Sequence, residues 1–103
     1  MNRLKTLRKN KKLLQRDLAL MLNITSSGYG FIETGKRNIT SDILIKLADF
    51  YNVSTDYILG RTDDPNIRVI EVEEGFEIEL QKDAPDLTSE EIEKLRQLIK
   101  EAG

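Results

Sequence analysis

Apolar residues recur every three to four positions through the first sixty residues of the chain, which is the spacing that places them on one face of a helix. The clearest stripe consists of Ile43, Leu44, Leu47, Ala48 and Tyr51. Shorter stripes of the same kind precede and follow it. The pattern predicts five short helices, over residues 2–10, 15–22, 25–34, 41–51 and 55–59.

Residues that favour helix ends stand between these segments. Asn23 and Gly35 tolerate the left-handed conformation that closes many helices. Thr25, Thr40 and Ser54 each offer a side-chain oxygen that can cap the helix that follows. Connections of only a few residues and the absence of any strand–helix–strand alternation indicate an all-α globule.

A domain boundary is predicted just after the fifth helix. Residues 61–66 are polar and contain Pro65, which cannot continue a helix. We therefore divide the chain into a head, residues 1–64, and a tail, residues 65–103.

The tail carries a different pattern. Residues 69–73 and 76–80 alternate apolar and polar side chains about Glu74 and Gly75, which predicts a two-stranded hairpin. Residues 88–91, Thr-Ser-Glu-Glu, have the form of a capping box, and the apolar positions after them predict a final amphipathic helix. An isolated hairpin is marginal in water, so both elements need a partner surface.

Composition removes most catalytic chemistry. The chain has no cysteine and no histidine, which excludes thiol nucleophiles, disulfides, the usual zinc sites and the commonest general base. We interpret the carboxylates as surface charges, and we expect no metal, no cofactor and no enzymatic activity. No apolar run approaches the ~18 residues of a membrane span, and the basic N-terminus lacks the apolar part of a secretory signal. A cytoplasmic protein without membrane contact is expected.

The two signs of charge are separated along the chain. Residues 1–48 carry ten Lys and Arg against three Asp and Glu, a net +7, whereas residues 49–103 carry a net −9. Such a division indicates that the basic part meets a polyanion and that the acidic part stays away from it. Two solvated surfaces of opposite sign remain the alternative.

Residues 15–34 have the layout of a DNA-binding helix-turn-helix, in which two short helices are joined by a tight turn. Ala19 is small where the two helices must approach, and Asn23 can adopt a positive φ at the turn. The inward apolar positions are Leu18, Leu22, Ile24, Tyr29 and Ile32.

Motifs spread over about sixty residues carry a family resemblance. They are Arg3-Leu4-Lys5-Thr6-Leu7-Arg8, Leu13, Gln15, Leu18-Ala19, Ile24-Thr25, Ile32-Glu33-Thr34-Gly35-Lys36-Arg37, Leu44, Leu47-Ala48-Asp49-Phe50-Tyr51, Asn52-Val53-Ser54, Asp56-Tyr57-Ile58-Leu59-Gly60 and Arg61-Thr62-Asp63-Asp64. The sequence resembles the phage Cro/cI-type repressors and their bacterial relatives, the Xre family. The resemblance implies a mainly α fold, a five-helix lambda-repressor-like DNA-binding domain, to which the hairpin and the C-terminal helix are added.

The resemblance also implies which residues meet double-stranded DNA. Residues 25–34 would lie in the major groove, with Ser26, Ser27 and Phe31 at base-reading positions, while Gln15 would contact phosphate and in some members of the family a base. Lys36, Arg37 and Asn38 would reach phosphate whatever the sequence. The full set of expected DNA-binding residues is Gln15, Arg16, Thr25, Ser26, Ser27, Gly28, Gly30, Phe31, Thr34, Lys36, Arg37 and Asn38.

Structural roles compete with these assignments. We interpret Tyr29 and Ile32 as core residues and Glu33 as a brace of the fold. Ser26 and Ser27 could instead cap the N-terminus of the helix.

Two features depart from the family pattern. Leu14 stands where the family has a capping Ser or Thr, which forgoes about 0.5–2 kcal/mol unless another group caps the helix. Gly28 and Gly30 lie within the recognition helix and each costs about 1 kcal/mol relative to alanine. This helix is therefore expected to fray in the free protein and to firm up on DNA.

One recognition helix reads only a few base pairs, so the family pairs two copies on half-sites about 34 Å apart. A homodimer is expected, joined by the apolar faces of the tail. The alternative is that the tail folds back on its own head. The expected dimer residues are Ile70, Val72, Phe76, Ile78, Leu80, Ile92, Leu95, Leu98 and Ile99.

These expectations combine into a sequence-specific DNA-binding transcriptional regulator, a repressor that binds a palindromic operator as a dimer. The repressor role follows from the family resemblance alone. A different class of function is a protein-interaction module of the antitoxin or anti-activator kind, with the C-terminal helix lying in a partner protein's groove. Binding to DNA would weaken steeply with salt, whereas an apolar helix contact would not.

Overall fold

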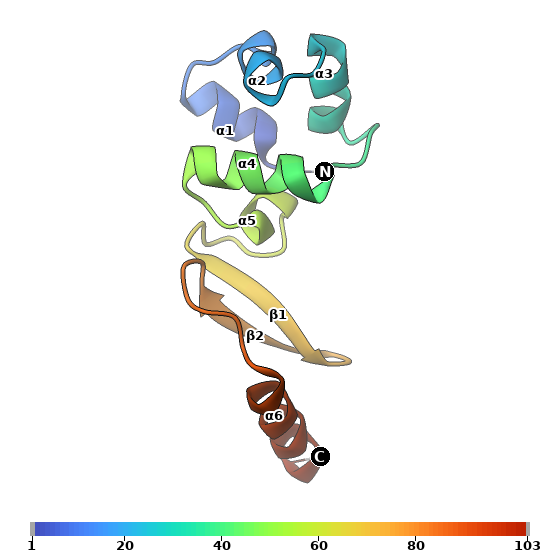
Figure 1. Ribbon diagram of the computed structural model, residues 1–103, viewed down its shortest axis with the longest axis vertical. Coiled ribbons are helices and arrows are strands. Elements are labelled where there is room, and N and C mark those ends of the chain that lie inside the picture. Colours follow the sequence, from blue (N-terminus) through green and yellow to red (C-terminus); the bar gives the residue numbers. More distant parts are fainter. Residues whose placement is uncertain (1, 103) are drawn as a thin grey trace.

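The computed structural model describes residues 2–102 and contains a helical head followed by a hairpin and a last helix (Figure 1). This architecture confirms the mainly α fold expected from the sequence. The elements are α1 (Leu4–Asn10), α2 (Gln15–Leu22), α3 (Ser26–Thr34), α4 (Ser41–Tyr51), α5 (Thr55–Leu59), β1 (Ile67–Glu73), β2 (Phe76–Gln81) and α6 (Ser89–Ala102).

The predicted helix ends are confirmed for α2 to α5. The side-chain oxygens of Thr25, Thr40 and Ser54 accept hydrogen bonds from the backbone N–H groups three residues later, at 3.0, 3.3 and 3.0 Å. Asn23 adopts a left-handed φ of 56° at the end of α2. Helix α1 begins at Leu4 rather than at residue 2, and α3 begins at Ser26, directly after its cap, rather than at residue 25.

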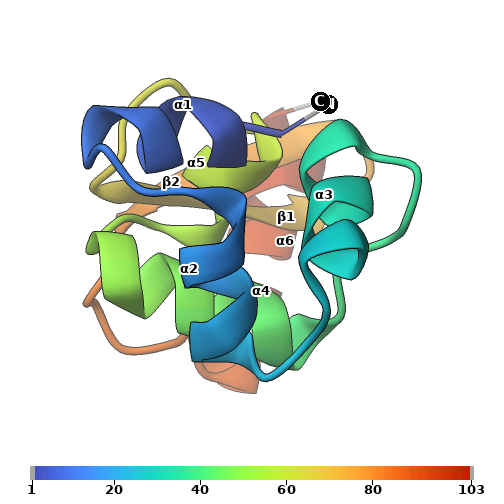
Figure 2. The same ribbon diagram turned by 90° about the horizontal axis from the view of Figure 1, so that it is seen from above.

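The core of the head is built from one fully buried side chain of each helix. Leu4, Leu18, Tyr29, Leu47 and Ile58 come from α1 to α5 in order, and none is more than 1% exposed. Fully burying an aliphatic side chain of this size stabilises a fold by about 1.5–3 kcal/mol. Viewed along the long axis of the molecule, the five helices surround this common centre (Figure 2).

The tail begins with an antiparallel hairpin, as predicted, although both strands are slightly longer than the residues 69–73 and 76–80 expected. Ile70 pairs with Ile78 across the hairpin, and a bulge interrupts the register between Glu71 and Glu73. Gly75 closes the turn with a φ of 80°, a value that side chains rarely tolerate. The bulge breaks the strict alternation of β1, so that Val69 and Val72 are both buried although they lie three residues apart.

The junction between head and tail is a set of specific contacts rather than a free linker. Asp56 on α5 is buried, and its carboxylate accepts hydrogen bonds from the Val69 N–H at 2.6 Å and from Arg61 at 3.1 Å. The Pro65 carbonyl accepts a hydrogen bond from the Ser54 N–H at 2.8 Å. The start of β1 is therefore fixed against α5, although residues 61–66 look like a flexible boundary in the sequence.

The last helix, α6, packs on the hairpin at the end of the molecule farthest from α1–α3 (Figure 1). The Arg96 guanidinium of α6 donates to the Val72 carbonyl at 2.7 Å. The molecule is consequently elongated, measuring 51 Å along one axis and 24 and 21 Å along the others. The hairpin contacts the head, whereas α6 reaches away from it.

Among the described residues, no helix is both long and apolar enough to cross a membrane. Within the same residues, no group of three acidic, histidine or cysteine side chains could hold a metal ion. Two surfaces stand out instead: the exposed face of α3 and an apolar groove in the tail.

Candidate nucleic-acid interface

Helices α2 and α3 form the helix-turn-helix that the sequence predicted. They pack directly against each other (Figure 2). The small side chain of Ala19 in α2 is buried. The turn is closed by the Ile24 N–H, which donates to the Ala19 carbonyl at 3.0 Å. The left-handed backbone of Asn23 then lets α3 start at once in a new direction.

Half of a capping box is kept at the start of α2, although Leu14 has no side-chain oxygen to supply the other half. Asp17 lies in the first turn, and its carboxylate accepts a hydrogen bond from the Leu14 N–H at 2.8 Å. A negative charge in the first turn also suits the positive end of the helix dipole. The start of α2 is therefore supported by Asp17 even though Leu14 cannot cap it. This role of Asp17 was not predicted from the sequence.

Helix α3 turns one face into the core and one face outward. Tyr29, Ile32 and Glu33 are buried, which agrees with the core and bracing roles expected of them. The side chains of Ser26, Ser27, Phe31 and Thr34 are exposed. The outward face therefore carries three hydroxyl groups and one aromatic ring.

A buried ion pair holds α3 against α1. The Glu33 carboxylate accepts hydrogen bonds from Arg8 Nε and Nη2, both at 2.9 Å. Arg8 Nη1 also donates to the Leu13 carbonyl at 2.9 Å. Burial is the largest single influence and would raise the pKa of Glu33. The hydrogen bonds and positive charge of Arg8, with further contributions from Tyr29 and Gln15, together outweigh burial and hold that pKa below its ordinary value.

The two glycines of α3 are explained by close approaches of other residues. A Cβ on Gly30 would lie 3.3 Å from Gln15 Oε1, so its absence lets the Gln15 amide lie against α3. A Cβ on Gly28 would lie 2.9 Å from the capping oxygen of Thr25 and 3.4 Å from Arg37 Nη1. Both glycines therefore make room beside the recognition helix.

The segment after α3 folds back on it. The Arg37 N–H donates to the Phe31 carbonyl at 3.1 Å, and Lys36 Nζ lies 6.0 Å from the centre of the Phe31 ring. Lys36, Arg37 and Asn38 are all exposed. Three side chains that can meet an anion therefore stand beside the outward face of α3.

Most of the twelve expected DNA-binding residues are accessible in the structure. Gln15 and Gly30 are half-buried against each other, and Gly28 is buried, so Gly28 shapes the surface rather than forming it. The exposed residues of the set are Arg16, Thr25, Ser26, Ser27, Phe31, Thr34, Lys36, Arg37 and Asn38.

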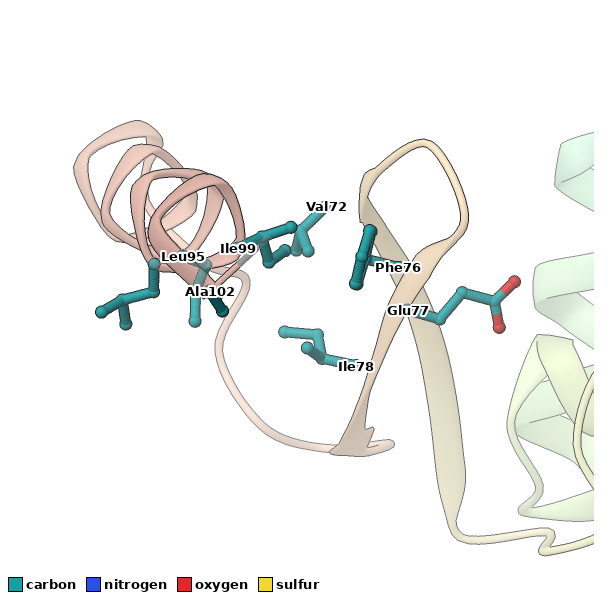
Figure 3. Close-up of a pocket in the computed structure, with 8 residues that line it drawn as sticks. Val72, Phe76, Glu77, Ile78, Leu95, Ile99 and Ala102 are labelled. Atoms are coloured by element: carbon teal, nitrogen blue, oxygen red, sulfur yellow. The ribbon is translucent and has the colours of Figure 1, made fainter.

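The tail carries the second surface, an open apolar groove of about 380 Å³ between the hairpin and α6 (Figure 3). Phe76 and Leu98 border it and are 51% and 61% exposed. Figure 3 shows Val72 and Ile78 facing α6, whereas Glu77 points away from the groove. The lining residues are Val72, Phe76, Glu77, Ile78, Leu95, Leu98, Ile99 and Ala102.

This lining overlaps with the residues expected to form a dimer contact. Val72 is already buried within the single chain, so it forms the floor of the groove and is not available for a contact with a second copy. Ala102 belongs to the lining and was missed, because a small residue adds little to an apolar pattern. Ile70, Leu80 and Ile92 do not line the groove.

Comparison with known proteins agrees with this geometry. A family model described as helix-turn-helix matches residues 4–58. The chain is 39% identical over 101 residues to the uncharacterized HTH-type transcriptional regulator YobD of Bacillus subtilis (strain 168), covering 95% of this chain and 90% of that protein.

Other relatives match about sixty residues of the chain. The HTH-type transcriptional regulator ImmR of the same organism is 39% identical over 61 residues, which is 59% of this chain and 48% of that protein. The SPbeta prophage-derived uncharacterized regulator YonR is 42% identical over 60 residues, 58% of this chain and 56% of that protein. No solved structure matches the chain. The α2–α3 geometry, the family match and the relatives together show that the chain belongs to the Xre/Cro-type helix-turn-helix family of transcriptional regulators.

Proposed function

We propose that this regulator is a repressor that binds a palindromic operator in the cytoplasm as a homodimer. The observation that carries the proposal is the outward face of α3, which is exposed and flanked by Gln15 and by the segment 36–38. A helix presented in this way fits the major groove, which is wide enough to admit it.

The charge distribution supports the head as the DNA-binding end. The net +7 lies in residues 1–48, which include α1 to α3, and the net −9 lies in the part that includes the whole tail. Because the molecule is elongated, the hairpin, which carries five glutamates, lies on the far side of α5 from α3. Phosphate therefore attracts the end that holds α3 and repels the hairpin.

Three exposed residues are assigned to the DNA backbone. Arg16 lies in the first turn of α2, and Lys36 and Asn38 follow α3, so they flank the helix that enters the groove. Contacts of this kind orient a protein on the duplex without reading its sequence. Each released counterion makes such binding weaken as salt is added.

The tail groove is assigned to a second copy of the chain. Its open position at the far end leaves α3 free in both copies, and the exposed Phe76 and Leu98 of one copy can cover the apolar lining of the other. A contact between identical surfaces is the commonest way in which small chains assemble. Repression then needs no further surface, because a bound dimer excludes other proteins from the same stretch of DNA.

Selection from a random double-stranded DNA pool, at low and at moderate salt, tests the proposal. We expect enrichment of an inverted repeat whose half-sites lie about 10 base pairs apart, centre to centre. Retention of DNA without an enriched sequence, lost as salt rises, would contradict it.

The groove also supports a second candidate, a protein-interaction module that binds a partner protein through the tail. An apolar contact of that kind would survive moderate salt. The same selection separates the two, since the second candidate predicts that no operator sequence is enriched.

A further inference from the structure

The side chains that α3 itself points outward carry little sequence information. Ser26, Ser27 and Thr34 present hydroxyls, which can donate to or accept from any base, and Phe31 can only pack on a thymine methyl. A sharp choice among base pairs needs a side chain that makes two hydrogen bonds to one base. None of the outward side chains of α3 can do so.

Arg37 supplies such a side chain from outside the helix. Its backbone is tied to α3 by the hydrogen bond from its N–H to the Phe31 carbonyl, at 3.1 Å. Its Nη1 lies 3.4 Å from the point where a Cβ on Gly28 would stand. The side chain therefore runs along α3 from the level of Phe31 toward the N-terminal turn, which is the part of a recognition helix that meets base edges.

The guanidinium of Arg37 is also uncommitted. Arg3, Arg8, Arg61, Arg68 and Arg96 each donate hydrogen bonds to a carboxylate or a carbonyl of the chain. Among residues 2–102, the arginines without such a partner are Arg16 and Arg37. Arg37 is exposed and thus keeps its donors available to a ligand.

Gly28 is the residue of α3 that lies beside the Arg37 guanidinium. A glycine inside a helix costs about 1 kcal/mol relative to alanine. Here an added Cβ would lie 2.9 Å from the capping oxygen of Thr25, where something must shift, and 3.4 Å from Arg37 Nη1, which is an ordinary contact. The guanidinium therefore lies directly against the N-terminal half of α3.

We propose that Arg37 is a base-reading residue that recognises guanine in the major groove of each half-site. Two of its N–H groups donate to O6 and N7 of one guanine, the pair of acceptors that a guanidinium fits best. This assignment rests on the proposed function and replaces the sequence-independent phosphate contact that the family resemblance implies for this position.

The test is DNA selection with the full chain and three variants. Arg37→Lys keeps the positive charge but loses the planar pair of donors. Arg37→Ala removes both the charge and the donors. Arg16→Ala is the matched control, because Arg16 is the other uncommitted arginine and is assigned to phosphate. Circular dichroism checks that each variant keeps its helices, which is expected since neither side chain holds a hydrogen bond in the fold.

We expect the wild-type motif to contain one guanine per half-site whose preference falls about tenfold or more in both Arg37 variants, with the other positions unchanged. Arg16→Ala should lower affinity for all sequences alike. A wild-type motif without such a guanine, or one whose guanine persists in Arg37→Ala, would overturn the inference and leave the proposed function standing. Enrichment of no sequence by the wild-type chain would overturn both.

Discussion

The Arg8–Glu33 pair shows how a single buried contact positions the DNA-binding surface. Its two hydrogen bonds of 2.9 Å join α1 to α3 where little water reaches, with side-chain exposures of 10% and 2%. The attraction in such a pair is largely offset by the cost of removing both charges from water. Removing only one partner is strongly destabilising, because the other charge then stays buried without an opposite charge beside it.

Glu33→Gln is therefore expected to lower the free energy of unfolding by about 3–5 kcal/mol near neutral pH. The pKa of Glu33 is depressed in the folded protein, so its contribution is present above the unfolded value of about 4.3 and is lost as pH falls through the lower folded value. The difference between wild type and variant should consequently shrink at acid pH. Urea unfolding at several pH values measures it.

Glu101→Gln makes the same chemical change at an exposed position near the end of α6 and serves as the control. It should alter stability by no more than about 0.5 kcal/mol. A Glu33→Gln protein as stable as this control would show that the pair does not hold α3 in place.

Single residues differ in how well the sequence reveals their role. Thr25, Thr40 and Ser54 were predicted as caps and act as caps, because a cap bonds only to its own helix. Asp17 was missed as the support of α2, since an acidic residue in a first turn has many ordinary uses. The partner of Glu33 was not predicted either, because Arg8 is distant in the chain.

At the scale of elements, α3 combines two weakening glycines with two side chains that fill the space they leave. Gln15 lies at Gly30, and Arg37 lies at Gly28. The sequence predicted a helix that frays in the free protein, and the structure adds a reason for the glycines to be there. The two glycines lower the intrinsic stability of α3 and allow other side chains to lie close beside it.

We predict that the amides of residues 26–31 exchange faster than those of α4 in the free protein and become protected on operator DNA. Gly30→Ala should slow this exchange, since alanine favours the helix by about 1 kcal/mol. It should also weaken operator binding, because the new Cβ would lie 3.3 Å from Gln15 Oε1 and displace that amide. Hydrogen exchange and DNA titration measure the two effects.

Gly28→Ala provides the contrast for this prediction. Its Cβ would lie 2.9 Å from the Thr25 oxygen that caps α3, so it should destabilise the helix instead. Equal protection of residues 26–31 with and without operator would refute the idea that DNA firms the helix.

For the whole molecule, elongation separates the two proposed contacts. The head meets DNA at one end, and the tail groove lies near the other (Figure 1). The buried Asp56 fixes the start of β1 against α5, so the direction of the tail relative to α3 is set by hydrogen bonds. A dimer built on the groove would thus hold its two recognition helices at a defined spacing.

Leu98→Glu is predicted to convert the proposed dimer into a monomer, because it places a charge beside the apolar groove without touching the buried core of the chain. Gln97→Glu is the matched control, since it adds the same charge one residue away on the exposed surface outside the groove lining. Sedimentation equilibrium distinguishes the two masses. A dimeric Leu98→Glu protein would place the contact elsewhere.

The sequence by itself determined the features that depend on neighbours in the chain. Helix periodicity, caps, left-handed ends and the hairpin turn are satisfied within a few residues, so their signals can be read locally. The helix-turn-helix and its outward residues followed from that spacing together with the family resemblance.

Only the tertiary structure decided the contacts that join distant segments. It paired Arg8 with Glu33, laid Arg37 along Gly28, tied Asp56 to Val69 and assembled the groove from the hairpin and α6. Each depends on how whole elements pack, and packing sums many weak contacts that no local pattern records. The same reason explains why α6 lies on the hairpin and away from the head.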